Sequence, residues 1–299
     1  MKFHVLGPLR LFEDDVFVQL SGIKRRAALG YLLLHANSVV ATSELVTALW
    51  GENPPPTARK ILQNAISGLR RTLPAHSGDP DSELLVTHAP GYLLRVDPEC
   101  VDLLQFRALA KRGQAALAAG RWHEAERDLR GALELWRGPA LSDLLEDGYD
   151  WPELTALQNE RFAVLESQME AALAAGKEQQ VISELEPVVG ADPLRERLAR
   201  QLMLALYRSG RQVDALGVYR RTRSALVEGL GLDPSPDLRA LERAILDHDP
   251  GLALGATEAR PATPPVVAGT PPPPPDALRW PRAPGRDRGR GSRVRARGG

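Results

Sequence analysis

Residues 56 to 73, PTARKILQNAISGLRRTL, combine a regular apolar pattern with one-sided polar chemistry. The apolar positions follow steps of three, one and four, the spacing of a single buried stripe on a helix, at Ala58, Ile61, Leu62, Ala65, Ile66, Leu69 and Leu73. The other side offers cations, amides and a hydroxyl, without any acid, at Arg59, Lys60, Gln63, Asn64, Ser67, Arg70 and Arg71. Most solvated helix faces mix both signs of charge, because mixing favours solubility and helix stability.

These side chains have the chemistry that nucleic acids require. Arg and Lys can bind phosphates or guanine, and Asn or Gln can pair with the edge of adenine. A carboxylate on the same face would meet the phosphate backbone at short range. The pattern therefore predicts a DNA-binding helix, and the competing interpretation is an ordinary amphipathic helix that happens to be basic. The residue types alone do not separate base contacts from phosphate contacts.

The neighbouring segments predict a scaffold that would present this helix. Short strands are expected in FHVLG, LRLF and VFVQL, which a Gly-Pro pair and an acidic turn separate. Helices are expected in KRRAALGYLLLHAN and TSELVTALWG, the second with Ser43 as its N-cap, and Pro56 or Thr57 would lie near the start of the third. The segment LLVTHAPGYLLRV predicts a terminal hairpin. This order is the layout of a winged helix, whose third helix enters the major groove.

Four further side chains lie where such a domain would approach DNA. Arg25 and Arg26 stand at the N-terminal end of the first helix. They could contact phosphate or, equally, interact only with solvent or a nearby acid. Thr87 and His88 lie in the predicted wing, near the path of the minor groove or the DNA backbone. The alternative for His88 is a plain hairpin residue.

The chain from 97 to 250 has a helical pattern that repeats itself. Gly120, Gly176 and Gly210 each precede a similar amphipathic segment, and the last two glycines are 34 residues apart. That distance is the tetratricopeptide period. The longer first interval predicts an inserted loop and an extra helix. We therefore expect an α+β winged helix over 1–96, an all-α tetratricopeptide-like domain over 97–250 and a disordered Pro- and Arg-rich tail over 257–299.

Charge is unevenly distributed along the 299 residues, although the formal net charge is zero. Residues 1–95 hold 10 Lys and Arg against 8 Asp and Glu, residues 96–256 hold 19 against 27, and residues 257–299 hold 9 against 3. Such asymmetry predicts different partners for different segments. The acidic helical segment is a poor DNA ligand and is better suited to contact another protein.

Other classes of function find little support in the residues. The one cysteine, Cys100, allows neither an intrachain disulfide nor a cysteine-based zinc site, and the six histidines lack metal-ligand spacing. We find no convergent set of polar groups that would serve catalysis, so we expect no catalytic, cofactor-binding or metal-binding residues. Without a signal-peptide core or an apolar run of membrane-spanning length, a cytoplasmic, nucleoid-associated protein is expected.

The string KRRAALGYLLLHANSVVATSELVTALWGENPPPTARKILQNAISGLRR, followed by GYLL and a tetratricopeptide-like domain, resembles the Streptomyces antibiotic regulatory protein family over about residues 1 to 250. The resemblance implies an OmpR-type winged helix followed by a bacterial transcriptional activation domain. It also implies binding to direct heptameric repeats near promoters, recruitment of RNA polymerase and activation of secondary-metabolite (antibiotic) gene clusters. The chain lacks the GxxxxGK[ST] phosphate loop of larger relatives and a receiver domain before the winged helix, which predicts a small, stand-alone member.

Two functions from different classes compete. The first is a sequence-specific, DNA-binding transcriptional activator, with double-stranded DNA, RNA polymerase holoenzyme and a second protomer as its partners. Direct repeats would place the two protomers side by side, head to tail. The second is a tetratricopeptide-type adaptor whose basic N-terminal domain binds a protein or RNA. The all-basic, amide-bearing helix with a wing behind it favours the first.

Overall fold

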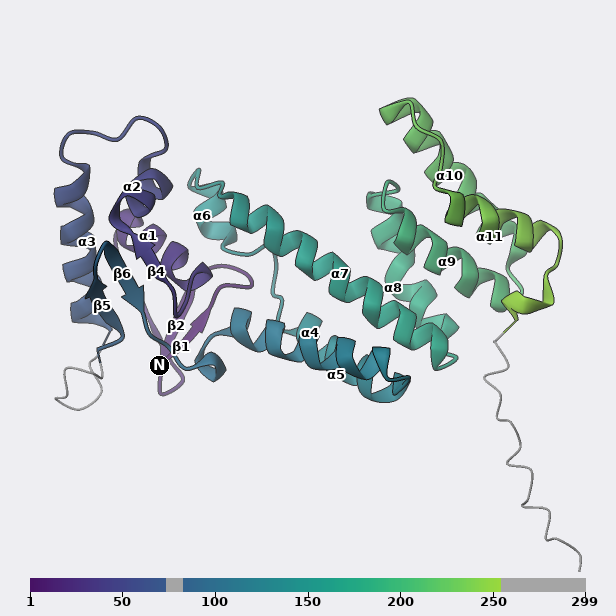
Figure 1. Cartoon of the computed structure of the whole chain (residues 1–299), viewed down its shortest axis with the longest axis horizontal. Helices are drawn as coiled ribbons and strands as arrows, with labels where there is room; N and C mark the ends of the chain where they lie inside the picture. The colour runs from purple at the N-terminus through teal and green to yellow at the C-terminus, as the bar shows by residue number, and fades with distance from the viewer. Residues whose placement is uncertain (74–82, 254–299) are drawn as a thin grey trace, which may run out of the picture. The chain divides into compact units, whose positions relative to one another are not determined.

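The computed structural model describes residues 1–73 and 83–253 (Figure 1). The tail predicted over 257–299 lies outside the described residues. The chain opens with an antiparallel sheet of order β1-β2-β3, formed by Lys2–His4, Arg10–Glu13 and Val16–Val18. Phe3 and Leu11 face each other across the first two strands, and both are buried. The three predicted strands are therefore present, with ends that differ from the prediction by up to three residues.

The winged helix follows, with its helices before its hairpin. Its elements are α1 (Ile23–Leu34), β4 (Val39–Ala41), α2 (Thr42–Trp50), α3 (Ala58–Thr72), β5 (Leu85–His88) and β6 (Gly91–Leu94). The second sheet has the order β4-β6-β5, so β4 forms its edge beside the hairpin. The sequence pattern did not predict β4, whose three residues run directly into α2 without a turn residue between them. The predicted Ser43 cap is wrong: α2 begins at Thr42, so Ser43 lies within the helix, and the N-cap residue, Ala41, makes no side-chain cap bond.

The rest of the described chain is helical. Its elements are the 3₁₀ turn η2 (Pro98–Cys100), α4 (Asp102–Ala118), α5 (Trp122–Glu134), α6 (Ser142–Glu146), α7 (Pro152–Ala174), α8 (Glu178–Ala191), α9 (Glu196–Arg208), α10 (Gln212–Leu230), α11 (Pro236–Leu246) and the 3₁₀ turn η3 (Pro250–Leu252). The predicted extra helix is α6, in the predicted insertion. None of the helices in the described ranges is long and apolar enough to cross a membrane.

Three helical hairpins confirm the predicted repeat. Gly120, Gly176 and Gly210 end the first helix of each hairpin with φ values of +70°, +71° and +77°. The residue after each glycine donates its backbone N–H to a carbonyl five residues earlier, at 2.8 to 2.9 Å. Glycine adopts this left-handed conformation without strain, and the bond satisfies an otherwise unpaired carbonyl at the helix end. The same turn chemistry therefore builds α4–α5, α7–α8 and α9–α10.

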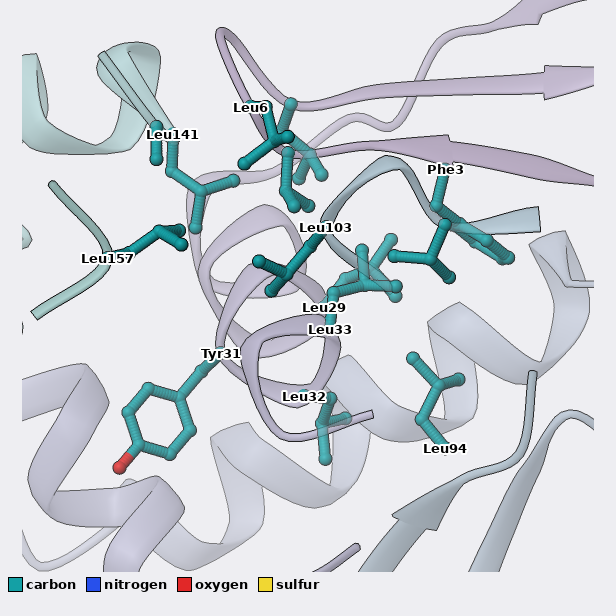
Figure 2. Close-up of a cluster of buried hydrophobic side chains, with 14 of the residues drawn as sticks. Phe3, Leu6, Leu29, Tyr31, Leu32, Leu33, Leu94, Leu103, Leu141 and Leu157 are labelled. Carbon is teal, nitrogen blue, oxygen red and sulfur yellow. The ribbon is translucent and has the colours of Figure 1, made fainter. Parts of the chain in front are cut away.

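The buried core does not divide at the predicted boundary near residue 97. One continuous cluster runs from Phe3 to Ala171 and includes side chains of the winged helix, α4, α5, α6 and α7. Figure 2 shows Leu103, Leu141 and Leu157 of the helical region around α1, with Leu103 next to Leu29. A second cluster fills the space among α7 to α11. The elements of the winged helix thus share their core with the first helical repeat.

Candidate nucleic-acid interface

Helix α3 buries one face and exposes the polar face that its sequence predicts. Its buried residues are Ala58, Leu62, Ala65, Ile66, Gly68 and Leu69, and this face packs against α1 and α2. All seven polar residues named above are exposed, from Arg59 to Arg71. Burial of the apolar stripe orients the helix, because turning it would expose that stripe to water. The basic pair in the last turn also complements the helix dipole.

One residue of the predicted stripe lies elsewhere. Ile61 is 36% exposed, at the edge of the polar face, one turn before Asn64. The seven-residue stripe drawn from sequence was therefore too wide at this position. An exposed aliphatic side chain on such a face is chemically suited to the methyl group of thymine. In the sequence, the spacing of three residues between Ile61 and Asn64 already indicated that Ile61 lies close to the polar face.

Three cations on this face have no acidic partner in the part of the chain that the structure describes. No carboxylate of residues 1–73 or 83–253 lies within 4.0 Å of Arg59, Lys60 or Arg71. Arginines of the helical region are often paired, as Arg107 is with Glu160 at 2.9 Å. Uncompensated positive charge on an exposed helix attracts a polyanion over a distance set by salt screening.

Arg70 joins α3 to the wing. Its Nε donates to the carbonyl oxygen of Leu85 at 3.0 Å, and its Nη2 donates to Oγ1 of Thr87 at 2.7 Å. Two of the predicted DNA-binding residues, Arg70 and Thr87, therefore bond to each other. His88 follows on the exposed wing, with Nδ1 3.1 Å from the carbonyl oxygen of Ala89. The bonds fix the angle between the helix and the hairpin, which a shared DNA surface requires.

Arg25 lies against α3. A Cβ atom built on Gly68 would come within 2.7 Å of Nε of Arg25, so the side chain crosses the helix where glycine leaves room. Gly68 follows Ser67 of the exposed face, and Arg25 is half-buried. The structure thus brings Arg25 next to the polar face, which its sequence position alone did not establish.

Arg26 has different surroundings from Arg25. Its guanidinium forms an ion pair with Asp143 of α6 and lies 3.6 Å from Asp147. Of the two alternatives raised by the sequence, the nearby acid is therefore the one seen here. Arg26 is directed at the helical region and links α1 to α6. No cluster of three or more metal-binding side chains occurs among the residues placed by the structure.

Comparison with known proteins agrees with this architecture. Residues 19–94 match the family described as "Transcriptional regulatory protein, C terminal", and residues 101–246 match "Bacterial transcriptional activator domain". DnrI of Streptomyces peucetius is 36% identical over 272 residues, which cover 90% of this chain and all of DnrI. The chain belongs to the Streptomyces antibiotic regulatory protein family. As a member of this family, it is a transcriptional regulator.

Two other relatives of the Streptomyces antibiotic regulatory protein family are longer. EmbR of Mycobacterium tuberculosis is 39% identical over 270 residues, which cover 90% of this chain and 68% of EmbR. AfsR of Streptomyces coelicolor is 39% identical over 265 residues, 88% of this chain but only 26% of AfsR. The structure of M. tuberculosis EmbR in complex with a low-affinity phosphopeptide has a TM-score of 0.78 and 40% identity, covering 83% of this chain and 65% of that chain.

Proposed function

We propose that this regulator is a sequence-specific, DNA-binding activator of a secondary-metabolite gene cluster. The observation that carries the proposal is the exposed face of α3, whose side chains include amides and three cations without a carboxylate partner in the described ranges, next to a wing that is hydrogen-bonded to Arg70. In a winged helix this face enters the major groove. Arg59, Lys60 and Arg71 supply charge for phosphate or guanine, while Gln63 and Asn64 can read adenine.

A binding titration tests the role of α3. The full chain is first used to select ligands from a random duplex library, and the best site is compared with scrambled DNA by mobility shift. We expect Asn64→Ala to cost about 1–3 kcal/mol on the best site and less on scrambled DNA, if it reads a base. Arg71→Ala should weaken binding to the best site and to scrambled DNA alike. The slope of log affinity against log salt should fall by about one unit if the lost contact is a phosphate.

The control for both variants is Lys111→Ala, which removes an exposed cation from α4 in the helical region. It should leave affinity and salt slope unchanged. Equal binding by wild type, Asn64→Ala and Arg71→Ala would refute the assignment of α3. Binding of RNA in preference to duplex DNA, or no DNA selected by a folded chain, would favour the adaptor alternative instead.

We further propose that two protomers bind side by side on direct repeats and that the helical region contacts RNA polymerase. The excess of acids over bases in residues 96–256 makes that region a poor DNA ligand. Stacked helical hairpins offer an extended surface for a protein partner. Sedimentation on the selected DNA, with and without polymerase holoenzyme, measures both claims. One protomer per site, with no larger complex on adding polymerase, would refute them.

A further inference from the structure

A cavity of about 600 Å³ opens among α5, α7 and α8, away from the α3 surface. Figure 1 shows that α7 runs alongside α5 and continues into the hairpin that it forms with α8. Most of the cavity wall is apolar, from Leu133, Phe162, Leu165, Pro187, Val188 and Ala191. This volume lies within the range of sites that hold small organic molecules.

The cation of the cavity wall, Arg161, has no hydrogen-bond acceptor among the described residues. Arg161 of α7 lines the cavity and places its guanidinium carbon 4.8 Å from the ring centre of Trp136. Stacking occupies the flat face of a guanidinium and leaves its N–H edge for an acceptor. No side chain or backbone oxygen of the described ranges accepts a hydrogen bond from Arg161, and no carboxylate there pairs with it. Burial lowers the pKa of this guanidinium.

The two acids of the cavity wall already have cationic partners. Glu184 accepts from Nε2 of Gln180 at 2.9 Å and lies 3.9 Å from Arg130, and Asp192 pairs with Arg195 at 2.9 Å. Among the charged side chains that line the cavity, Arg161 is therefore the one without an oppositely charged partner in the described part of the chain. Gln158, one helical turn earlier on α7, adds an amide to the same wall.

We propose that this cavity binds a small organic anion with an apolar body. Its carboxylate, sulfonate or phosphate accepts the N–H edge of Arg161, and its body lies on the aliphatic and aromatic wall. A guanidinium and an oxyanion form paired, charge-assisted hydrogen bonds, which are strong where water is partly excluded. The inference goes beyond the proposed function and does not depend on it, since neither α3 nor the wing contributes to the site.

Two fluorescent probes of similar shape test the proposal. The full chain is titrated with 1-anilinonaphthalene-8-sulfonate, an anion, and with N-phenyl-1-naphthylamine, which lacks the sulfonate. We expect one saturable site per chain for the anion. Arg161→Met keeps an apolar stem over Trp136 and removes the charge. It should weaken binding of the anion about tenfold or more, which corresponds to 1.4 kcal/mol or more, and it should change binding of the neutral probe less than about twofold.

Two further variants complete the test. Arg200→Met removes an exposed arginine of α9 outside the cavity, and it should bind both probes like wild type. Ser183→Trp puts a large side chain on the cavity wall and should weaken both probes together. Circular dichroism confirms that each variant is folded. Unchanged anion binding in folded Arg161→Met, or unchanged binding of both probes in Ser183→Trp, would overturn the proposal. The second comparison holds even if the Arg161 variant fails to fold.

Discussion

Arg70 and Arg71 are neighbours in the sequence with different surroundings. The guanidinium of Arg70 donates hydrogen bonds to Leu85 and Thr87 of the wing, whereas Arg71 is exposed and has no carboxylate partner in the described ranges. We infer that Arg71 contacts DNA directly and that Arg70 acts as a positioning residue for the wing. The two roles therefore predict different effects on DNA binding when a substitution at Thr87 of the wing is added to each arginine variant.

A double-mutant cycle separates these roles. Arg70→Ala and Thr87→Val should each weaken DNA binding, but the double variant should lose less than the sum, with a coupling of about 1 kcal/mol for the shared hydrogen bond. Arg71→Ala combined with Thr87→Val is the matched control and should be additive. Mobility-shift titrations of all variants measure the coupling. Additivity in both pairs would contradict the positioning role.

Glu126 predicts a pH dependence of stability. Burial raises the pKa of its carboxyl, but hydrogen bonds from Arg130 and Lys177 outweigh burial and hold the pKa below its usual value of 4.5. The folded state therefore binds its proton less readily than the unfolded state. The stabilisation by these bonds is complete above the unfolded pKa and is lost as pH falls through the folded pKa.

Urea unfolding at several pH values checks this dependence. The difference in unfolding free energy between wild type and Glu126→Gln should be largest near neutral pH and shrink below about pH 4. Glu160→Gln, which removes an exposed partner of Arg107, is the control and should show a much smaller change. A difference for Glu126→Gln that stays constant from pH 7 to pH 3 would contradict the assignment.

At the scale of elements, the wing depends on a close approach between two strands. Gly91 starts β6 opposite Ala41 of β4. A Cβ atom there would overlap the carbonyl oxygen of Val40 and come within 2.8 Å of the Ala41 Cα. Backbone cannot move aside as the end of a flexible side chain can. Strand β4, which the sequence pattern did not predict, is therefore the element that requires glycine at the base of the wing.

The same substitution at two glycines should have opposite effects. Gly91→Ala should destabilise the protein by about 1–3 kcal/mol, because it overpacks the contact with β4. Gly131 lies inside α5, and a Cβ atom there would lie 3.9 Å from Cδ1 of Leu109, which is ordinary contact. Gly131→Ala should therefore stabilise the protein by about 0.5–1 kcal/mol through helix propensity. Thermal unfolding measures both. Equal melting temperatures for the two variants would show that β4 does not crowd Gly91.

At the scale of the whole described chain, one buried carboxylate joins the N-terminal sheet to the helices. Asp102, at the start of α4, is 3% exposed. It accepts the backbone N–H groups of Val5 at 2.9 and 3.1 Å and of Leu6 at 3.1 Å, and it pairs with Arg137. Buried donors and a buried charge require partners. The loop after β1 is thus held by a residue about a hundred positions away.

Asp102→Ala should be strongly destabilising. It leaves the backbone N–H groups of Val5 and Leu6 without an acceptor and removes the carboxylate that pairs with Arg137, which costs about 3–5 kcal/mol for a broken buried pair. Asp102→Asn retains one carbonyl oxygen and should cost less. Urea unfolding of the full chain gives both values, and alanine at the exposed Asp97 is the control. A cost for Asp102→Ala below that of Asp102→Asn would contradict this account.

Local chemistry in the sequence determined the helices, the polar face of α3 and the repeated turns at Gly120, Gly176 and Gly210. These features depend on periodicity and on the φ values that single residues allow, which act over a few neighbouring positions. Tertiary structure decided that Arg26 pairs with Asp143, that Asp102 holds the first loop and that β4 crowds Gly91. It also decided that one core spans the predicted boundary and that Arg161 faces a cavity. These contacts join residues far apart in the chain, so no local pattern encodes the distances between them.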